Sequence, residues 1–161
     1  MSTTDRSEAT RIADQLRRAF DGDAWHGDSV LEILDGVTVA QAASRPVKSA
    51  HTIWELVLHI AAWDGAALRR LGGAAVELPD AQNFPLVADT SEPAWRKALA
   101  QVRRVHEELI VAVSALPDSR LHEMVPGKEK EGAHYTFYYM LHGVVQHELY
   151  HAGQIALLKK A

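Results

Sequence analysis

The chain has 161 residues, a formal net charge of -4 and no cysteine. This length is typical of one domain with a buried core, so we expect residues 1–161 to form a single domain. The lack of cysteine excludes disulfides, thiolate metal ligands and a cysteine nucleophile, and the acidic balance disfavours a nucleic-acid-binding surface.

Two features of the sequence bear on location. No stretch approaches the roughly 18 consecutive apolar residues of a membrane span. Residues 1–11 are polar and lack the apolar centre of a signal peptide. We therefore expect a cytoplasmic protein that binds neither membranes nor nucleic acids.

The hydrophobic pattern predicts helices rather than strands. In residues 7–20, Ile12 and Leu16 belong to an apolar series with a spacing of four, which indicates a first long helix. Short helical turns are expected at 29–34 and 39–43. These two turns connect the first long helix to the second.

Three more long helices follow. The second is predicted from about residue 50 to the glycine pair at 72–73, because glycine readily adopts the conformation that ends a helix. Residues 73–90 are expected to be a loop. The third helix is predicted at 91–116, beginning at a serine, an acid and a proline. After a polar connection, the fourth spans about 134–159.

Four long helices predict an all-α fold, a four-helix bundle. The segment 135–139 is aromatic and contains threonine, so it could also form a strand. We assign it to the fourth helix because the helical pattern continues through it.

The most informative motif is His-Glu-Leu-Tyr-His at residues 147–151. Histidines four residues apart lie on the same face of a helix, and both can reach one point. The face around His147 and His151 is mostly apolar, so it should point into the core. His59 on the second helix lies on a face that also carries Glu55 and Trp63.

Burying three imidazoles is costly unless each has a partner. One divalent metal ion bound by His59, His147 and His151 would satisfy all three, and Zn²⁺, Ni²⁺ or Fe²⁺ suits such a set. The alternative is that these are separate core histidines, each with its own hydrogen bond.

Two other metal sites are possible from the motif. As a zinc-protease signature, it would make Glu148 the general base, but only ten residues follow His151 for a third ligand. A di-iron site would use Glu148 and His151, but no other helix supplies the matching Glu-x-x-His pair.

The remaining histidines give weaker signals. His142 points away from His147 and is expected to be exposed. His51 could cap the second helix or support the site from outside, and His26 is expected in a turn. The others lie on polar stretches or near helix ends: His106, His122 and His134.

Several segments together resemble the DinB/YfiT-like superfamily over nearly the whole chain. They are His-Thr-Ile-Trp-Glu-Leu-Val-Leu-His at 51–59, continuing to Trp63, and Gln-His-Glu-Leu-Tyr-His-Ala-Gly-Gln at 146–154. Trp-His-Gly at 25–27 and Asn-Phe-Pro at 83–85 also fit the pattern.

The resemblance implies a four-helix bundle of up-down-down-up type that holds one divalent metal ion with three histidines. Carried over position by position, these ligands are His59, His147 and His151. It also implies a homodimer. Some members of the family are thiol S-transferases, and one is a maleylpyruvate isomerase.

Three functions follow as hypotheses. The first is transfer of a low-molecular-weight thiol to a small electrophile. The second is hydrolysis by water activated on the metal, and the third is a non-catalytic bundle with a structural or sensory metal. No catalytic residue is identified from the sequence, and the weak candidates are Glu55, Glu148 and Tyr150.

Overall fold

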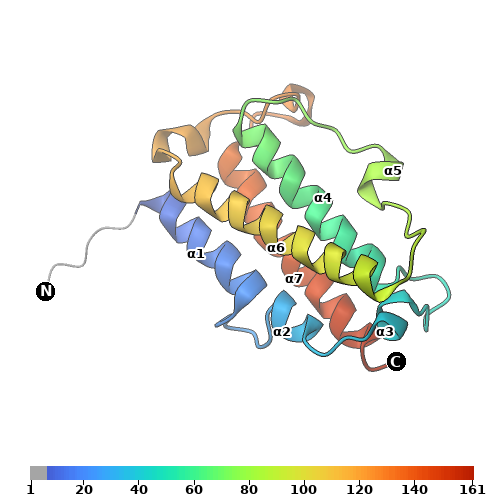
Figure 1. Ribbon diagram of the computed structural model, residues 1–161. Coiled ribbons are helices and arrows are strands. Elements are labelled where there is room, and N and C mark those ends of the chain that lie inside the picture. The colour runs from blue at the N-terminus through green and yellow to red at the C-terminus, as the bar shows by residue number, and fades with distance from the viewer. Residues whose placement is uncertain (1–6) are drawn as a thin grey trace, which may run out of the picture.

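The computed structural model describes residues 7–161, which form a bundle of helices (Figure 1). Its long helices are α1 (Glu8–Asp21), α4 (Ile53–Leu71), α6 (Glu92–Ser114) and α7 (Phe137–Leu158). Short helices connect them: α2 (Val30–Leu34), α3 (Val39–Ala43), α5 (Asp80–Asn83), and the 3-10 helices η1 (Asp118–His122) and η2 (Glu129–Glu131). The structure confirms the predicted all-α bundle, and the described residues contain no strand.

The four long helices surround a shared core. Both α6 and α7 pack against α4, and both also pack against α1, so α1 and α4 lie at opposite corners of the bundle. Apolar residues fill the interior in two clusters. One lies around α2, α3 and the first half of α4, and the other lies between α1, the ends of α4 and α6, and the start of α7.

Local sequence explains where the helices begin. The Thr52 side chain accepts a hydrogen bond from the Glu55 backbone N–H, and the Glu55 carboxylate accepts one from the Thr52 backbone N–H. This reciprocal pair satisfies two otherwise free donors and starts α4. At the other end of α4, Gly73 takes a φ of 94°, where a side chain would be strained.

Two predicted boundaries were wrong. Residues 134–136 are not helical, because Thr136 caps α7 by accepting a hydrogen bond from the Tyr139 backbone N–H. Thr136 also pairs with Met124 in an isolated β-bridge. In addition, the predicted loop 73–90 contains the short helix α5, which carries a residue of the site.

None of the helices in the described range is both long and apolar enough to cross a bilayer. The prediction about a signal peptide falls partly on residues 1–6, which lie outside the described residues.

Candidate metal centre

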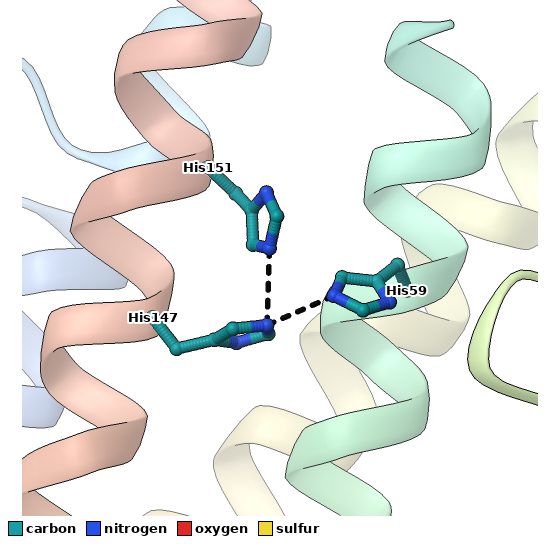
Figure 2. Close-up of side chains that lie close together, drawn as sticks. All are labelled: His59, His147 and His151. Atoms are coloured by element: carbon teal, nitrogen blue, oxygen red, sulfur yellow. Dashed lines mark hydrogen bonds between the residues drawn. The ribbon is translucent and has the colours of Figure 1, made fainter. Parts of the chain in front are cut away.

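Three histidine side chains meet between α4 and α7 (Figure 2). The Nε2 atom of His147 lies 2.9 Å from Nε2 of His59 and 3.0 Å from Nε2 of His151. His147 and His151 are one turn apart on α7, and His59 faces them from α4. The structure thus brings together the three histidines that the sequence singled out.

The outer nitrogens of two of these rings are fixed by acceptors. Nδ1 of His59 donates to the backbone carbonyl of Asn83 at 2.8 Å, and Nδ1 of His151 donates to the side-chain oxygen of Gln154 at 2.6 Å. In a neutral imidazole only one nitrogen carries a proton. The Nε2 atoms of His59 and His151 therefore present lone pairs to His147.

This arrangement fits a bound cation better than a set of hydrogen bonds. A proton on Nε2 of His147 could be donated along only one of the two contacts, and the other would join two lone pairs. Metal–nitrogen bonds of about 2.1 Å place ligand nitrogens about 3.0 Å apart at a right angle and about 3.4 Å apart at the tetrahedral angle. The observed distances between the Nε2 atoms suit a divalent transition metal that has further coordination positions open.

The protonation state of the histidines also suits metal binding. Burial lowers the pKa of His147 to about 3, with a smaller effect from the neighbouring His151 and His59. Burial likewise lowers the pKa values of His59 and His151. At neutral pH all three rings are neutral, which is the form that coordinates a metal.

The segment around α5 supports the centre from outside. The side-chain oxygen of Asn83 accepts a hydrogen bond from the Trp63 indole at 2.8 Å, while its carbonyl holds His59. The Phe84 ring stacks between His59 and His51, with centroids 4.0 and 3.7 Å away. The Phe84 ring thus separates His51 from His59, and the supporting role of His51 stays a prediction.

The three histidines open onto a cavity of about 520 Å³. Its walls are largely aromatic and apolar, and the exposed Tyr139 and Tyr150 stand at its rim. Cavities of this size and lining hold small organic molecules. The described residues that line this cavity include: His59, Trp63, Arg70, Asn83, Tyr135, Tyr139, Met140, Val144, His147, Tyr150 and His151.

The sequence model of the DinB superfamily matches residues 23–155, which is most of the chain. The chain belongs to the DinB superfamily. No curated protein and no solved structure gives a significant match.

In this DinB protein, Glu55 does not reach the cavity. Its carboxylate caps α4 and binds the Arg45 guanidinium at 2.7 Å and Nδ1 of His51 at 3.3 Å. Burial alone would raise the pKa of Glu55, but hydrogen bonds from Thr52 and Arg45 outweigh it and lower the pKa. A carboxylate held in this way is a poor proton acceptor, which argues against a catalytic role.

Glu148 also lies elsewhere. It follows His147 by one residue, so it is rotated by about 100° around α7 and does not line the cavity. Its side chain is fully buried beside His106 of α6. The zinc-protease interpretation, which needs Glu148 at the metal, is therefore wrong. Tyr150 does line the cavity and remains available to a substrate.

Glu148 belongs to a second buried cluster, with Asp64 of α4 and His106 of α6. Nδ1 of His106 lies 3.0 Å from the Asp64 carboxylate and 2.9 Å from the Glu148 carboxylate, and the three side chains are at most 1% exposed. On its other side the imidazole stacks on Phe20 of α1 at 4.0 Å. The cluster thus connects all four long helices.

The cluster acts as a charged cross-link, in which the His106 imidazolium of α6 is held between carboxyl groups from α4 and α7. Burial alone would lower the pKa of His106, but the adjacent carboxylates outweigh it and raise the pKa to about 10. Burial, and then the neighbouring Asp64 charge, raise the pKa of Glu148. The imidazolium of His106 thus lies between the carboxyl groups of Asp64 and Glu148. The donor set is compatible with a metal ion, but the histidine already serves the carboxylates as a counter-ion.

This cluster was not predicted, because the neighbours of His106 in the sequence are polar. The signal was present in the periodicity, since His106 continues the buried stripe of α6. The prediction for His142 was also wrong: it is half-buried and lines the cavity, because the bundle leaves α7 open on that side. His26, His122 and His134 are exposed, and His26 lies in a turn as expected.

Gln154 gives a direct test of how the ligands are held. Replacing it with leucine removes the acceptor for Nδ1 of His151, so we expect metal affinity to fall by about 10- to 100-fold. Gln154→Glu keeps an acceptor and should retain most of the affinity. Competition with a chromophoric chelator measures both, and a leucine variant with undiminished affinity would show that the hydrogen bond does not orient the ring.

Proposed function

We propose that this DinB protein is a metal-dependent enzyme of thiol S-transferase type that acts on a small electrophile. The observation that carries the proposal is the convergence of three neutral imidazoles at the wall of a cavity of about 520 Å³. His59, His147 and His151 would hold one divalent ion, Zn²⁺, Ni²⁺ or Fe²⁺, and leave positions open toward the cavity.

A divalent ion held there supplies a positive charge that lowers the pKa of a bound thiol. The protein contributes position and shape. Hydrogen bonds from His59 to Asn83 and from His151 to Gln154 fix the two rings, and Trp63 packs edge-on against His59 and His147. An aromatic and apolar wall excludes water from the reacting groups.

The cavity favours thiol transfer over hydrolysis. Hydrolysis benefits from a general base beside the attacking water, and such bases are often carboxylates. Among the described residues that line the cavity, none is aspartate or glutamate, and both acidic candidates from the sequence have other partners. A thiol bound as its anion needs no such base in the transfer step.

The test is consumption of an electrophile. Protein loaded with Zn²⁺, Ni²⁺ or Fe²⁺ is mixed with 1-chloro-2,4-dinitrobenzene, alone or with cysteine, glutathione or coenzyme A. We expect thiol conjugation above the uncatalysed rate only when both metal and thiol are present, and loss of that rate in His147→Ala.

Two outcomes would contradict the proposal. Turnover of ester or amide substrates without any thiol would favour hydrolysis. No turnover with a broad set of thiols and electrophiles, together with a large metal-dependent rise in melting temperature, would favour a structural or sensory metal.

A further inference from the structure

A buried arginine lies on the wall of the same cavity and takes no part in holding the histidines. Arg70 stands near the end of α4, is 2% exposed and lines the cavity. Eleven residues separate it from His59, which is close to three full turns, so both lie on the same face of the helix. Trp63 lies on this face between them.

The contacts of Arg70 leave its charge without a counter-ion. Nε and Nη2 donate to the backbone carbonyl of Val76 at 3.1 and 2.6 Å, and the guanidinium lies 5.6 Å from the centre of the Trp63 ring. Among residues 7–161, no carboxylate forms an ion pair with Arg70, and its Nη1 makes no hydrogen bond beside those of Nε and Nη2. Burying an unpaired charge is costly, so a ligand that brings a negative charge to Arg70 would relieve that cost.

The rest of the cavity supports an anionic ligand. Its described lining contains no acidic residue, and Arg70 is its arginine among histidines, amides, aromatic rings and apolar groups. The Trp63 ring lies between the histidines and Arg70. It lies 5.9 Å from the His147 ring and 5.6 Å from Cζ of Arg70.

We propose that Arg70 binds the carboxylate of a small organic acid, whose apolar body lies along Trp63 and whose other end approaches the three histidines. A single guanidinium matches a carboxylate, whereas a phosphate usually gathers several cations or backbone N–H groups. The inference deepens the proposed function, on which it rests, by assigning the substrate class: an acid with an apolar or aromatic body.

The test compares benzoate with its neutral isostere benzamide by isothermal titration calorimetry. Metal is first removed with a chelator, so that the carboxylate cannot gain affinity by coordinating an ion. A charge-assisted hydrogen bond at a buried site should make benzoate bind about tenfold more tightly than benzamide. Arg70→Gln keeps a donor for the Val76 carbonyl but loses the charge, so it should abolish this preference.

Arg69→Gln is the matched control, because Arg69 is the exposed neighbour on the same helix and should leave the preference unchanged. Equal binding of benzoate and benzamide to the wild type would overturn the proposal, as would absence of benzoate binding. Retention of the preference by Arg70→Gln would overturn it too. If that variant does not fold, the wild-type comparison still decides, and Arg70→Lys should keep part of the preference.

This experiment separates the inference from the proposed function. Metal uptake by the wild type is measured on its own. A protein that takes up no metal but prefers benzoate through Arg70 would reject the enzyme proposal and leave the anion site standing. A protein that binds metal but shows no preference would reject only the anion site.

Discussion

Replacing His106 with leucine is expected to lower the free energy of unfolding by about 3–5 kcal/mol at pH 7. The variant leaves the carboxylates of Asp64 and Glu148 together in the core, both fully buried and without their counter-ion. Urea unfolding followed by circular dichroism measures the change. The control is His122→Leu, which alters an exposed histidine and should stay within about 0.5 kcal/mol of the wild type.

Replacing the whole cluster should behave differently. When Asp64, His106 and Glu148 are all changed to leucine, no charge is left buried, and such exchanges are often neutral or stabilising. Recovery of stability in the triple variant would show that the loss in His106→Leu comes from unpaired charge. A loss of less than about 1 kcal/mol in His106→Leu would contradict the charged cross-link.

The pH dependence of the free energy of unfolding of the wild type and of His106→Leu gives a second test. The pKa of His106 is raised to about 10 in the folded state, above its ordinary value of 6.5. Its stabilising effect is therefore fully present below pH 6.5 and is lost as the pH rises toward 10. The groups that face it are Asp64 from α4, Glu148 from α7 and the uncharged Phe20 from α1.

We therefore expect the stability difference between wild type and His106→Leu to be largest near neutral pH. It should shrink as the pH rises from about 7 to 10, because the wild type then also holds its carboxylates without a cation. A difference that stays constant over this range would show that His106 stabilises the core by packing alone.

Replacing a ligand histidine should remove metal-dependent stability. At a free Zn²⁺ concentration about 1,000 times the dissociation constant, binding stabilises the folded state by about 4 kcal/mol. For a chain of this length that is roughly 8–16 °C in melting temperature. His147→Ala removes the nitrogen that lies between the other two, so we expect the shift to disappear at the same Zn²⁺ concentration.

Differential scanning fluorimetry with and without Zn²⁺, and again after chelation, measures this effect. His122→Ala is the control, because that histidine is exposed and should respond to Zn²⁺ as the wild type does. A His147→Ala protein that keeps the full shift would place the metal elsewhere, with Asp64, His106 and Glu148 as the next set to test.

The sequence was most informative where periodicity and chemistry agreed. Histidines at positions 147 and 151 had to share a face of α7, and the apolar stripe around them pointed that face inward, so their meeting with His59 could be predicted. Several helix boundaries were also close, because Ser91 and the glycines after α4 are strong capping signals.

Other features depend on tertiary contacts that local sequence does not encode. Asn83 reaches His59 and Trp63 only because the segment 73–90 folds back over α4, and no periodic pattern marks a loop of this kind. The charged cluster was hidden for another reason. All three of its polar residues are buried in the core: Asp64, His106 and Glu148. In the sequence each looks like an exposed residue, because its partners lie on other helices.

We propose above that His59, His147 and His151 hold one divalent metal ion. Elemental mass spectrometry of the protein purified without an affinity tag tests it most directly, beside His59→Ala, His147→Ala and His151→Ala. We expect about one equivalent of zinc, nickel or iron per chain in the wild type and a loss of that metal in each variant. A wild type that contains no such metal and takes none up on reconstitution would contradict it.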